Sequence, residues 1–321
     1  MASTREIKER INSIKNTLKI TNAMYMISST KLNNARKSLA DTEPYYYALQ
    51  AMFARVLRHL PEGYTHPYLE VREKSEDFNP RKAVICVTAD KGLAGAYNHN
   101  VLKMVEKEIR PDFNDMLYVV GEVGRQYFYH HNVNVDGEFL YTAQNPSLAR
   151  ARAISEEILT LYREKEIDEV YLIYTEMKNS MECETKMIQL LPLIRLDEKL
   201  FHSNAGITAV QRDSIALLPN PGDLLDNIIP EYVNGYVYSA LIESYCAEHN
   251  SRMQAMDSAN KNGEKLLAEL SIRYNRERQA QITQEITEIA AGAKARAQQL
   301  EIQRKRMRKQ MAENGLSAVT E

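Results

Sequence analysis

The sequence predicts an α/β protein in which long N- and C-terminal helices form an antiparallel coiled coil and a central domain holds a mainly parallel sheet. Three observations lead to this fold class. All ten prolines lie between Pro44 and Pro230, so both ends of the chain lack the residue that breaks helices. Apolar residues recur at spacings of three and four near the N-terminus, as in coiled coils. The middle alternates short apolar runs with helical patterns, which is typical of a sheet covered by helices.

The first element is a helix expected from Thr4 to about Arg58. A second apolar stripe, made by Ile20, Met24 and Ile27, lies on a different face from the seam and predicts contact with a further surface. Pro44 predicts a kink or a short break, because proline removes a helical hydrogen bond. The seam residues are Ile7, Ile11, Ile14, Leu18, Thr21, Tyr25, Ser28, Leu32, Ala35 and Leu39.

The middle of the chain is expected to begin with an irregular connector over residues 59–80, which is rich in proline. Apolar runs then predict four buried strands, with helices over the three intervening amphipathic segments. This order predicts a Rossmann-like parallel sheet. The strands are expected at 82–88, 116–121, 169–175 and 186–191, and the helices at 97–109, 121–131 and 146–163.

The C-terminal part is expected to be helical from Pro230 to about Ala312, since no proline follows Pro230. At about 1.5 Å per residue, this helix would be about 120 Å long and the N-terminal helix about 80 Å long. Neither fits inside a globule, so we expect them to pair as an antiparallel coiled coil. The predicted divisions are an N-terminal shaft helix (1–58), a connector and globular α/β domain (59–229), a C-terminal shaft helix (230–296) and a basic extension (297–321).

Composition excludes several classes of protein. The 321 residues are 26% charged with a net charge of −2, and no apolar run approaches the roughly 20 residues of a membrane-spanning helix, so no direct membrane span is expected. The N-terminus lacks a signal-peptide pattern. The three cysteines, Cys86, Cys183 and Cys246, form no CxxC pair, which argues against a disulfide framework and a zinc site and favours a reducing, cytosolic setting.

The charge is unevenly distributed along the chain. Residues 1–40 hold eight Lys or Arg and only two Glu, and a second basic run extends from Arg304 to Lys309. A solvated helix face and a contact with a negatively charged partner explain these runs about equally well. A basic coiled-coil protein associated with nucleic acid is therefore the alternative function, although no aromatic platform is interleaved with the basic residues. Affinity purification would distinguish a nucleic-acid-associated protein from a subunit of a protein complex, because it would bring down nucleic acid in the first case and protein subunits in the second.

No catalytic site is predicted in this chain, and no cofactor or metal. The turn from Thr88 to Asn98 follows a strand and opens a helix, but it matches neither GxGxxG nor GxxxxGK[ST]. We interpret Gly92 and Gly95 as parts of a tight connection rather than a nucleotide site. The seven histidines show no metal-ligand spacing, and no nucleophile motif is present. A nucleotide-dependent enzyme would instead bind ATP or NAD in a titration of the purified chain.

Five segments resemble the gamma subunit of F-type ATP synthases. In chain order, the first is residues 5–8, the second runs from Ile14 to Met24, and the fourth is residues 252–256. The fifth and longest, from Tyr274 to Ile289, reads Tyr-Asn-Arg-Glu-Arg-Gln-Ala-Gln-Ile-Thr-Gln-Glu-Ile-Thr-Glu-Ile. The third is Asp-Lys-Gly-Leu at residues 90–93, which is similar to the family's Asp-Arg-Gly-Leu turn. The resemblance spans residues 1 to about 296, and the terminal segments are long enough to be specific.

The resemblance implies a non-catalytic rotor shaft that couples ion-driven rotation of a c ring to ATP synthesis or hydrolysis at sites formed by alpha and beta subunits. The implied partners are the alpha and beta subunits, the epsilon subunit and the c ring, with no nucleic acid. The implied location is peripheral, on the cytoplasmic face of the bacterial plasma membrane. In this family the alpha and beta subunits alternate in a hexamer around the shaft. The residues implied to contact this hexamer, or to hold the two shaft helices together, are Met24, Ile20, Ile27, Arg252, Arg278, Gln279 and Thr283.

Two departures from the family pattern stand out. The family's usual Lys-Ala-Met-Lys/Glu-Met segment is Asn22-Ala23-Met24-Tyr25-Met26 here, so a charge commonly found on either side of the methionine is missing. Family members commonly stop soon after the position of Gly292, whereas this chain continues with the basic extension 297–321. We expect the extension to prolong the shaft or to fray at its end.

Overall fold

The computed structural model describes residues 4–61, 63–70, 80–109, 115–131, 133, 135–179, 182–193 and 220–317. The chain forms two compact units, which are treated separately below. The helical unit comprises residues 1–21 and 259–321, and the sheet unit comprises residues 22–258. The elements are α1 (Thr4–Arg58), β1 (Lys82–Val87), α2 (Tyr97–Glu108), β2 (Met116–Val120), α3 (Glu122–His130), α4 (Leu148–Arg163), β3 (Glu169–Met177), β4 (Cys183–Leu191) and α6 (Pro221–Ser317).

The sheet has four strands in the order β2-β1-β3-β4. β1 pairs in parallel with β2 and with β3, which confirms the mainly parallel sheet. β4 differs from the expectation, because it lies antiparallel to β3 at the edge and begins at Cys183 rather than Lys186. The connection from Met177 to Cys183 is too short for the crossover that a parallel neighbour needs, so the two strands form a hairpin.

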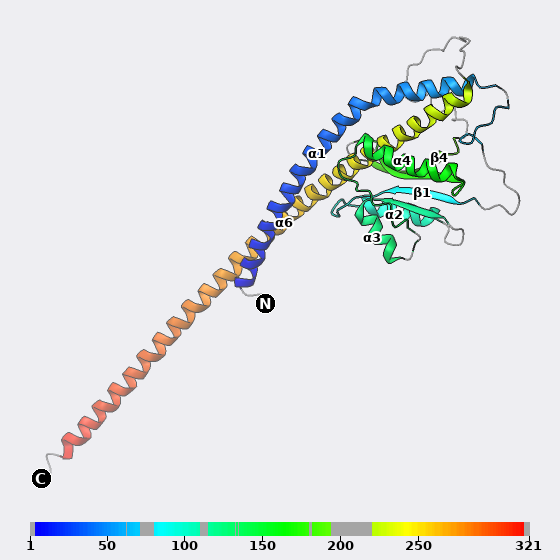
Figure 1. The fold of residues 1–321 in the computed structure, drawn as a ribbon. Coiled ribbons are helices and arrows are strands. Elements are labelled where there is room, and N and C mark those ends of the chain that lie inside the picture. Colours follow the sequence, from blue (N-terminus) through cyan, green and yellow to red (C-terminus); the bar gives the residue numbers. More distant parts are fainter. Residues whose placement is uncertain are drawn as a thin grey trace. The chain divides into compact units, whose positions relative to one another are not determined.

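Helices cover both faces of this sheet (Figure 1). Along β1, Ala83, Ile85 and Val87 pack against α4 and the sheet-unit parts of α1 and α6. Val84 and Cys86 lie on the opposite face, where they pack against α2 and α3. Successive side chains of a strand point to opposite faces, so a fully apolar strand requires cover on both sides.

In the sheet unit, α1 and α6 pack through aromatic rings. The Phe53 and Tyr232 rings stack with centroids 4.8 Å apart, and Tyr46 stacks on Tyr238 at 6.3 Å. Contacts at higher numbers in α1 go to lower numbers in α6, so the two helices are antiparallel. Gly235 makes this approach possible, because a Cβ there would lie 2.3 Å from Cε1 of Tyr46.

Of the kink or short break predicted at Pro44, the break does not occur, since α1 stays helical through this residue. Proline costs a helix one hydrogen bond, but nearby residues of α1 are buried in the core of the sheet unit. Tyr46, Leu49 and Phe53 are among them. Tertiary packing of this kind outweighs local propensity.

The helical unit is also antiparallel. Leu18 of α1 lies against Gly263 of α6, where an added Cβ would come within 2.6 Å of the leucine Cδ2. Thr21 donates a hydrogen bond to Asn260, and Thr4 donates one to Gln281 over 3.0 Å. Gly263 and the short polar side chains of Thr21 and Asn260 therefore allow close approach of the two backbones.

Helix α6 begins at Pro221, nine residues before the predicted start at Pro230. Asn220 is placed as an N-cap, because its Oδ1 accepts a hydrogen bond from the backbone N–H of Asp223 at 2.8 Å. Pro221 occupies the first helical position, which tolerates proline because no intrahelical bond is needed from its nitrogen. Helix α6 continues to Ser317. Within the described part of the chain, no helix is both long and apolar enough to cross a membrane.

Candidate functional site

The candidate residues of α1 present apolar surface to solvent. Ile20 is 61% exposed and Ile27 is 57% exposed, while Met24 is half-buried. Ile20 belongs to the helical unit, and Met24 and Ile27 belong to the sheet unit. In contrast, the seam residue Leu32 is buried. The two stripes predicted from the sequence thus differ in burial, and the second one is available to a partner.

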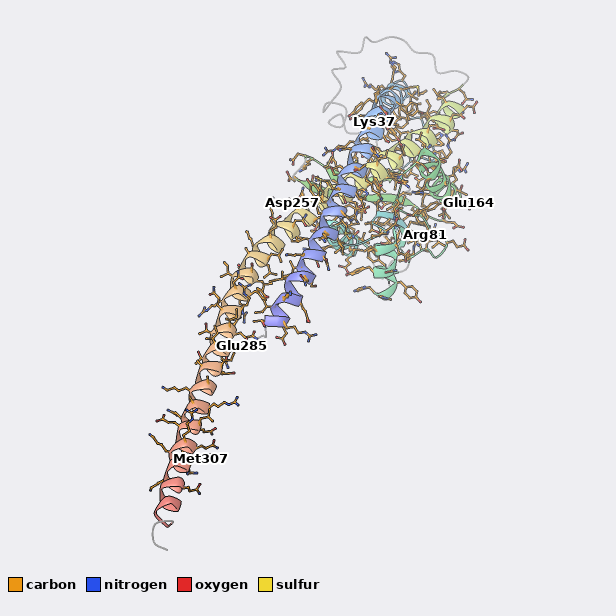
Figure 2. All side chains as sticks on the ribbon, turned by 90° about the vertical axis from the view of Figure 1, so that its left-hand side faces the viewer. Lys37, Arg81, Glu164, Asp257, Glu285 and Met307 are labelled. Carbon is orange, nitrogen blue, oxygen red and sulfur yellow. The ribbon has the colours of Figure 1, made fainter. Side chains whose placement is uncertain are left out.

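The candidate residues in the C-terminal half of α6 are fully on the surface. Arg278, Gln279 and Thr283 are exposed, as is every side chain described from residue 278 onward. The Thr283 hydroxyl donates to the Gln279 carbonyl at 2.8 Å, within the same helix. Figure 2 shows the start of α1 beside α6 near Glu285, and farther along, at Met307, α6 has no second described element beside it. The part of α6 from Arg278 onward, whose described side chains are all exposed, is called the bare segment below, and it has an apolar stripe formed by Ile282, Ile286 and Ile289.

Arg252 is placed differently, because it is buried inside the sheet unit. Only 6% of it is exposed. Its Nη2 donates to the Lys91 carbonyl at 3.0 Å and to the Gly92 carbonyl at 3.1 Å. Its Nη1 lies 2.6 Å from a carboxylate oxygen of Glu248, one turn earlier in α6. The guanidinium therefore joins α6 to the turn that follows β1, a pairing that neither segment signals in the sequence.

Two titratable neighbours surround this guanidinium. Burial raises the pKa of Glu248, and the charge of Arg252 opposes that rise. Burial, with the charges of Arg252 and Lys31, lowers the pKa of His249 to about 3. His249 is therefore neutral at physiological pH, and its Nδ1 lies 3.3 Å from Nη1 of Arg252, where it can accept a hydrogen bond. The cluster carries one buried cation and one buried carboxylate.

The Asp-Lys-Gly-Leu turn has a structural role. The Asp90 carboxylate accepts hydrogen bonds from the backbone N–H groups of Glu122 (3.2 Å), Ala143 (3.2 Å) and Gln144 (3.1 Å). It thereby holds the start of α3 and the loop before α4. Gly95 has a φ of +57°, which suits glycine. These contacts favour the interpretation of the turn as a tight connection rather than a phosphate cradle.

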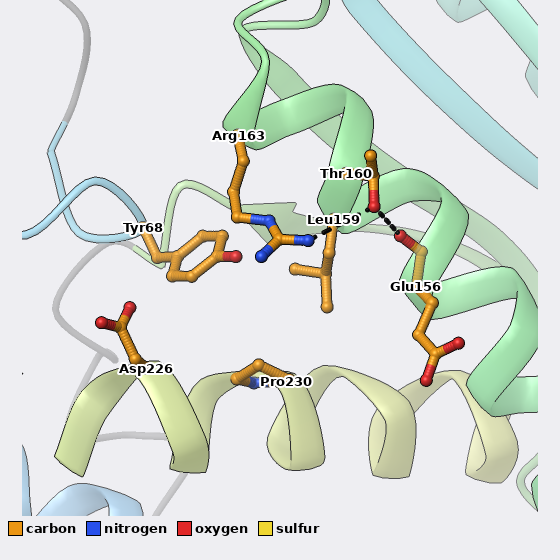
Figure 3. Close-up of a pocket in the computed structure, with 7 residues that line it drawn as sticks. All are labelled: Tyr68, Glu156, Leu159, Thr160, Arg163, Asp226 and Pro230. Atoms are coloured by element: carbon orange, nitrogen blue, oxygen red, sulfur yellow. Dashed lines mark hydrogen bonds between the residues drawn. The ribbon is translucent and has the colours of Figure 1, made fainter. Parts of the chain in front are cut away.

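A pocket of about 780 Å³ lies between α4, α6 and the connector (Figure 3). An Arg163 nitrogen donates to the Thr160 hydroxyl at 3.4 Å, and that hydroxyl donates to the Glu156 carbonyl at 2.7 Å. Charges of both signs line it, without a nucleophile paired with a base. The lining residues are Tyr68, Glu156, Leu159, Thr160, Arg163, Asp226 and Pro230. Among the residues with described positions, no group of three or more His, Cys, Asp or Glu could hold a metal ion.

Comparison with known proteins agrees with this arrangement. The family model described as ATP synthase matches residues 3–295. An ATP synthase gamma chain of Ruminiclostridium cellulolyticum is 42% identical over 298 residues, covering 91% of this chain and 98% of the relative. The ATP synthase gamma chain of Caldanaerobacter subterraneus is 43% identical and covers 90% of this chain and 98% of the relative.

A solved structure has the same fold. A chain of the mitochondrial ATP synthase of Euglena gracilis, from its OSCP/F1/c-ring assembly, superimposes with a TM-score of 0.63 at 17% identity, covering 91% of this chain and 94% of that chain. The family model ends at residue 295, so the last part of α6 lies beyond it. The match along nearly the whole chain at more than 40% identity shows that this protein belongs to the gamma chain family of ATP synthases.

Proposed function

We propose that this chain acts as the central rotor shaft of an F-type ATP synthase and couples ion-driven rotation of a c ring to ATP synthesis or hydrolysis at alpha/beta sites. The observation that carries the proposal is the antiparallel pairing of the terminal helices, followed by a bare segment of α6 with an apolar stripe. An exposed apolar stripe on a long helix is typical of a surface that a partner covers.

The mechanism follows from the asymmetry of such a shaft. One chain supplies both helices, so the paired region has no rotational symmetry and presents different side chains in different directions. Each of three catalytic sites around it would meet a different face. Rotation then changes which conformation each site prefers, and binding energy is exchanged with torque.

The proposed partners are the alpha, beta and epsilon subunits and the c ring. The names of the relatives support assembly into an ATP synthase, and the Euglena structure contains F1 and a c ring. The proposed location is the cytoplasmic face of a bacterial plasma membrane, where the chain is held through its partners. The functional division at residues 58/59, 229/230 and 296/297 remains part of this proposal.

The proposed contacts with the hexamer are the exposed candidate residues. Ile20, Met24 and Ile27 offer apolar surface on α1, and Gln279 and Thr283 lie one turn apart on α6. Arg278 presents a planar fork of donors to solvent, which suits a carboxylate or carbonyl group on a beta subunit. Arg252 is proposed to act inside the sheet unit, as developed in the next subsection.

Reconstitution with purified alpha and beta subunits tests the proposal. ATP hydrolysis by the assembled complex should depend on this chain, and Arg278→Ala or Met24→Lys should slow it. Arg296→Ala is the matched control, since Arg296 is also an exposed arginine of α6 but lies beyond the family model. Hydrolysis that is equally fast without the chain would contradict the rotor role. Equal losses in Arg278→Ala and Arg296→Ala would contradict the assignment of Arg278.

A further inference from the structure

In other proteins of this architecture, a crevice at the carboxyl edge of the sheet binds ligands. In open α/β sheets, ligands bind beyond the carboxyl ends of the strands at the point where the strand order reverses. The order β2-β1-β3-β4 places that point between β1 and β3. The turn at 90–93 follows β1 at this edge, and Thr175 lies near the end of β3.

In this protein, α6 occupies the crevice. Near the end of β3, the backbone N–H of Thr175 donates to the Ser244 hydroxyl at 3.1 Å. Beyond β1, Arg252 holds the carbonyls of Lys91 and Gly92. Between these two points, Ala247 is fully buried. Nine residues of α6, from Ser244 to Arg252, therefore span the gap from one strand to the other.

Small side chains make this close fit possible. Ala247 packs in a cluster with Ala89, Ala94 and Tyr97, and the Tyr97 hydroxyl donates to the Val87 carbonyl at 3.2 Å. The backbone of the turn also approaches α6, since a Cβ at Gly95 would lie 3.9 Å from the Cβ of Ala255. Close-packed interiors have no room for added atoms. A ligand in this place would have to displace the helix.

We propose that the ligand crevice of the sheet serves here as a socket for α6, and that Arg252 locks the helix in it so that torque passes between the sheet and α6 without slip. This inference rests on the rotor function proposed above. It makes Arg252 a positioning residue within the rotor. The socket consists of residues 244–252 of α6 and the loops that follow β1 and β3.

The chemistry of the lock requires arginine. A planar guanidinium can pair with the Glu248 carboxylate and donate to two carbonyl oxygens at once, whereas an ammonium group is a single point charge on a flexible stem. Removing the guanidinium would leave Glu248 as an uncompensated buried charge and would leave the Lys91 and Gly92 carbonyls without this donor. We therefore expect Arg252→Lys to restore the lock only weakly.

The test measures ions pumped per ATP hydrolysed by the complete synthase in membrane vesicles. Arg252→Gln should lower this ratio by about fivefold or more, the scale of typical coupling between distant sites. Ala247→Leu, which overfills the socket without touching a charge, should lower it as well. An unchanged ratio in Arg252→Gln would overturn the proposal.

A disulfide rescue distinguishes the loss of the Arg252 contacts from a loss of folding in the Arg252→Gln variant. The 3.9 Å between the Cβ positions of residues 95 and 255 lies in the range of native disulfides. Gly95→Cys with Ala255→Cys, added to Arg252→Gln and Cys183→Ser, should regain pumping when oxidised and lose it again when reduced. The same chain with Gly95→Cys alone controls for strain at the positive φ of Gly95. A crosslink that forms without restoring the ratio would overturn the proposal.

Failure of the socket proposal can be told apart from failure of the proposed rotor function. If the chain is not a rotor, the unmodified protein will fail to support pumping when assembled with its partners. If only the socket is wrong, the unmodified protein will couple normally and Arg252→Gln will couple equally well.

Discussion

Glu243 on α6 is a carboxylate whose charge state depends on the fold. One of its carboxylate oxygens is buried without a hydrogen-bond partner among the described residues, and the other accepts from the Ser239 hydroxyl at 3.2 Å. Burial, and next the charge of Glu176, raise its pKa from 4.5 to about 7, while Ser239 and Lys186 act in the opposite direction. Glu43 of α1 adds to the rise, so groups on three neighbouring elements set the value.

The raised pKa predicts that Glu243 destabilises the fold at high pH. Between pH 4.5 and about 7 the folded chain holds a proton that the unfolded chain releases, so stability falls as pH rises through this window. A shift of this size corresponds to roughly 3 kcal/mol. Glu243→Gln should therefore raise the free energy of unfolding at pH 8 and have little effect at pH 4.5, as measured by urea denaturation. Glu264→Gln, an exposed carboxylate of the same helix, should leave the pH profile unchanged.

The structural role of a single residue can be predicted from local sequence in some cases and not in others. The N-cap Asn220 and the first-turn Pro221 could have been recognised from their order alone, because asparagine followed by proline is a helix-start signal. The burial of Arg252 could not have been recognised in this way, since two of its partners, the carbonyls of Lys91 and Gly92, lie about 160 positions away. Long-range contacts of this kind leave no periodicity in the sequence.

At the scale of elements, the glycines of α6 differ in a way that can be measured. Gly235 lies against the Tyr46 ring, whereas no atom in the described part of the chain lies within 4 Å of a Cβ added at Gly292. Gly235→Ala should destabilise the chain by about 1–3 kcal/mol, because overpacking exceeds the helix-propensity gain. Gly292→Ala should instead be neutral or stabilising by up to about 1 kcal/mol. Equal effects in chemical denaturation would contradict the packing of α1 on α6.

The last part of α6 gives a second prediction for an element. Residues 297–317 continue the helix beyond the family model, and their described side chains are exposed. Deleting residues 297–321 should leave ATP turnover by the assembled complex nearly unchanged, because a passive tail carries no contact needed for turnover. A large loss of ATP-driven ion pumping in the truncated protein would show that the tail is not passive.

Most elements were predictable because each has a local signal. The strands β1, β2 and β3 are apolar runs, and the helices between them are amphipathic. The direction of β4 was not predictable, because it depends on the hairpin connection to β3. The continuity of α1 through Pro44 was not predictable either, because it depends on burial against α6. The sequence likewise predicted the exposed stripe of Ile20 and Ile27 but not the socket around Arg252.

At the scale of the whole molecule, the terminal helices and the sheet have separate tasks in the proposed rotor. The sheet unit grips α6 through the socket, and the bare segment of α6 offers apolar and cationic side chains to a surrounding partner. A shaft of this kind needs stiffness, and no proline occurs in α6 after Pro230. As such a shaft, this chain is proposed to turn inside a hexamer of alpha and beta subunits as ATP is hydrolysed.

Observation of rotation in single complexes tests that claim most directly. The chain would be assembled with immobilised alpha and beta subunits and labelled with a probe through Tyr129→Cys, because Tyr129 of α3 is 79% exposed. Cys183→Ser would remove the half-buried native thiol. We predict that ATP drives rotation of the probe in one direction, with three equal pauses per turn. Continued ATP hydrolysis while the labelled chain stays fixed relative to the hexamer would contradict the rotor function.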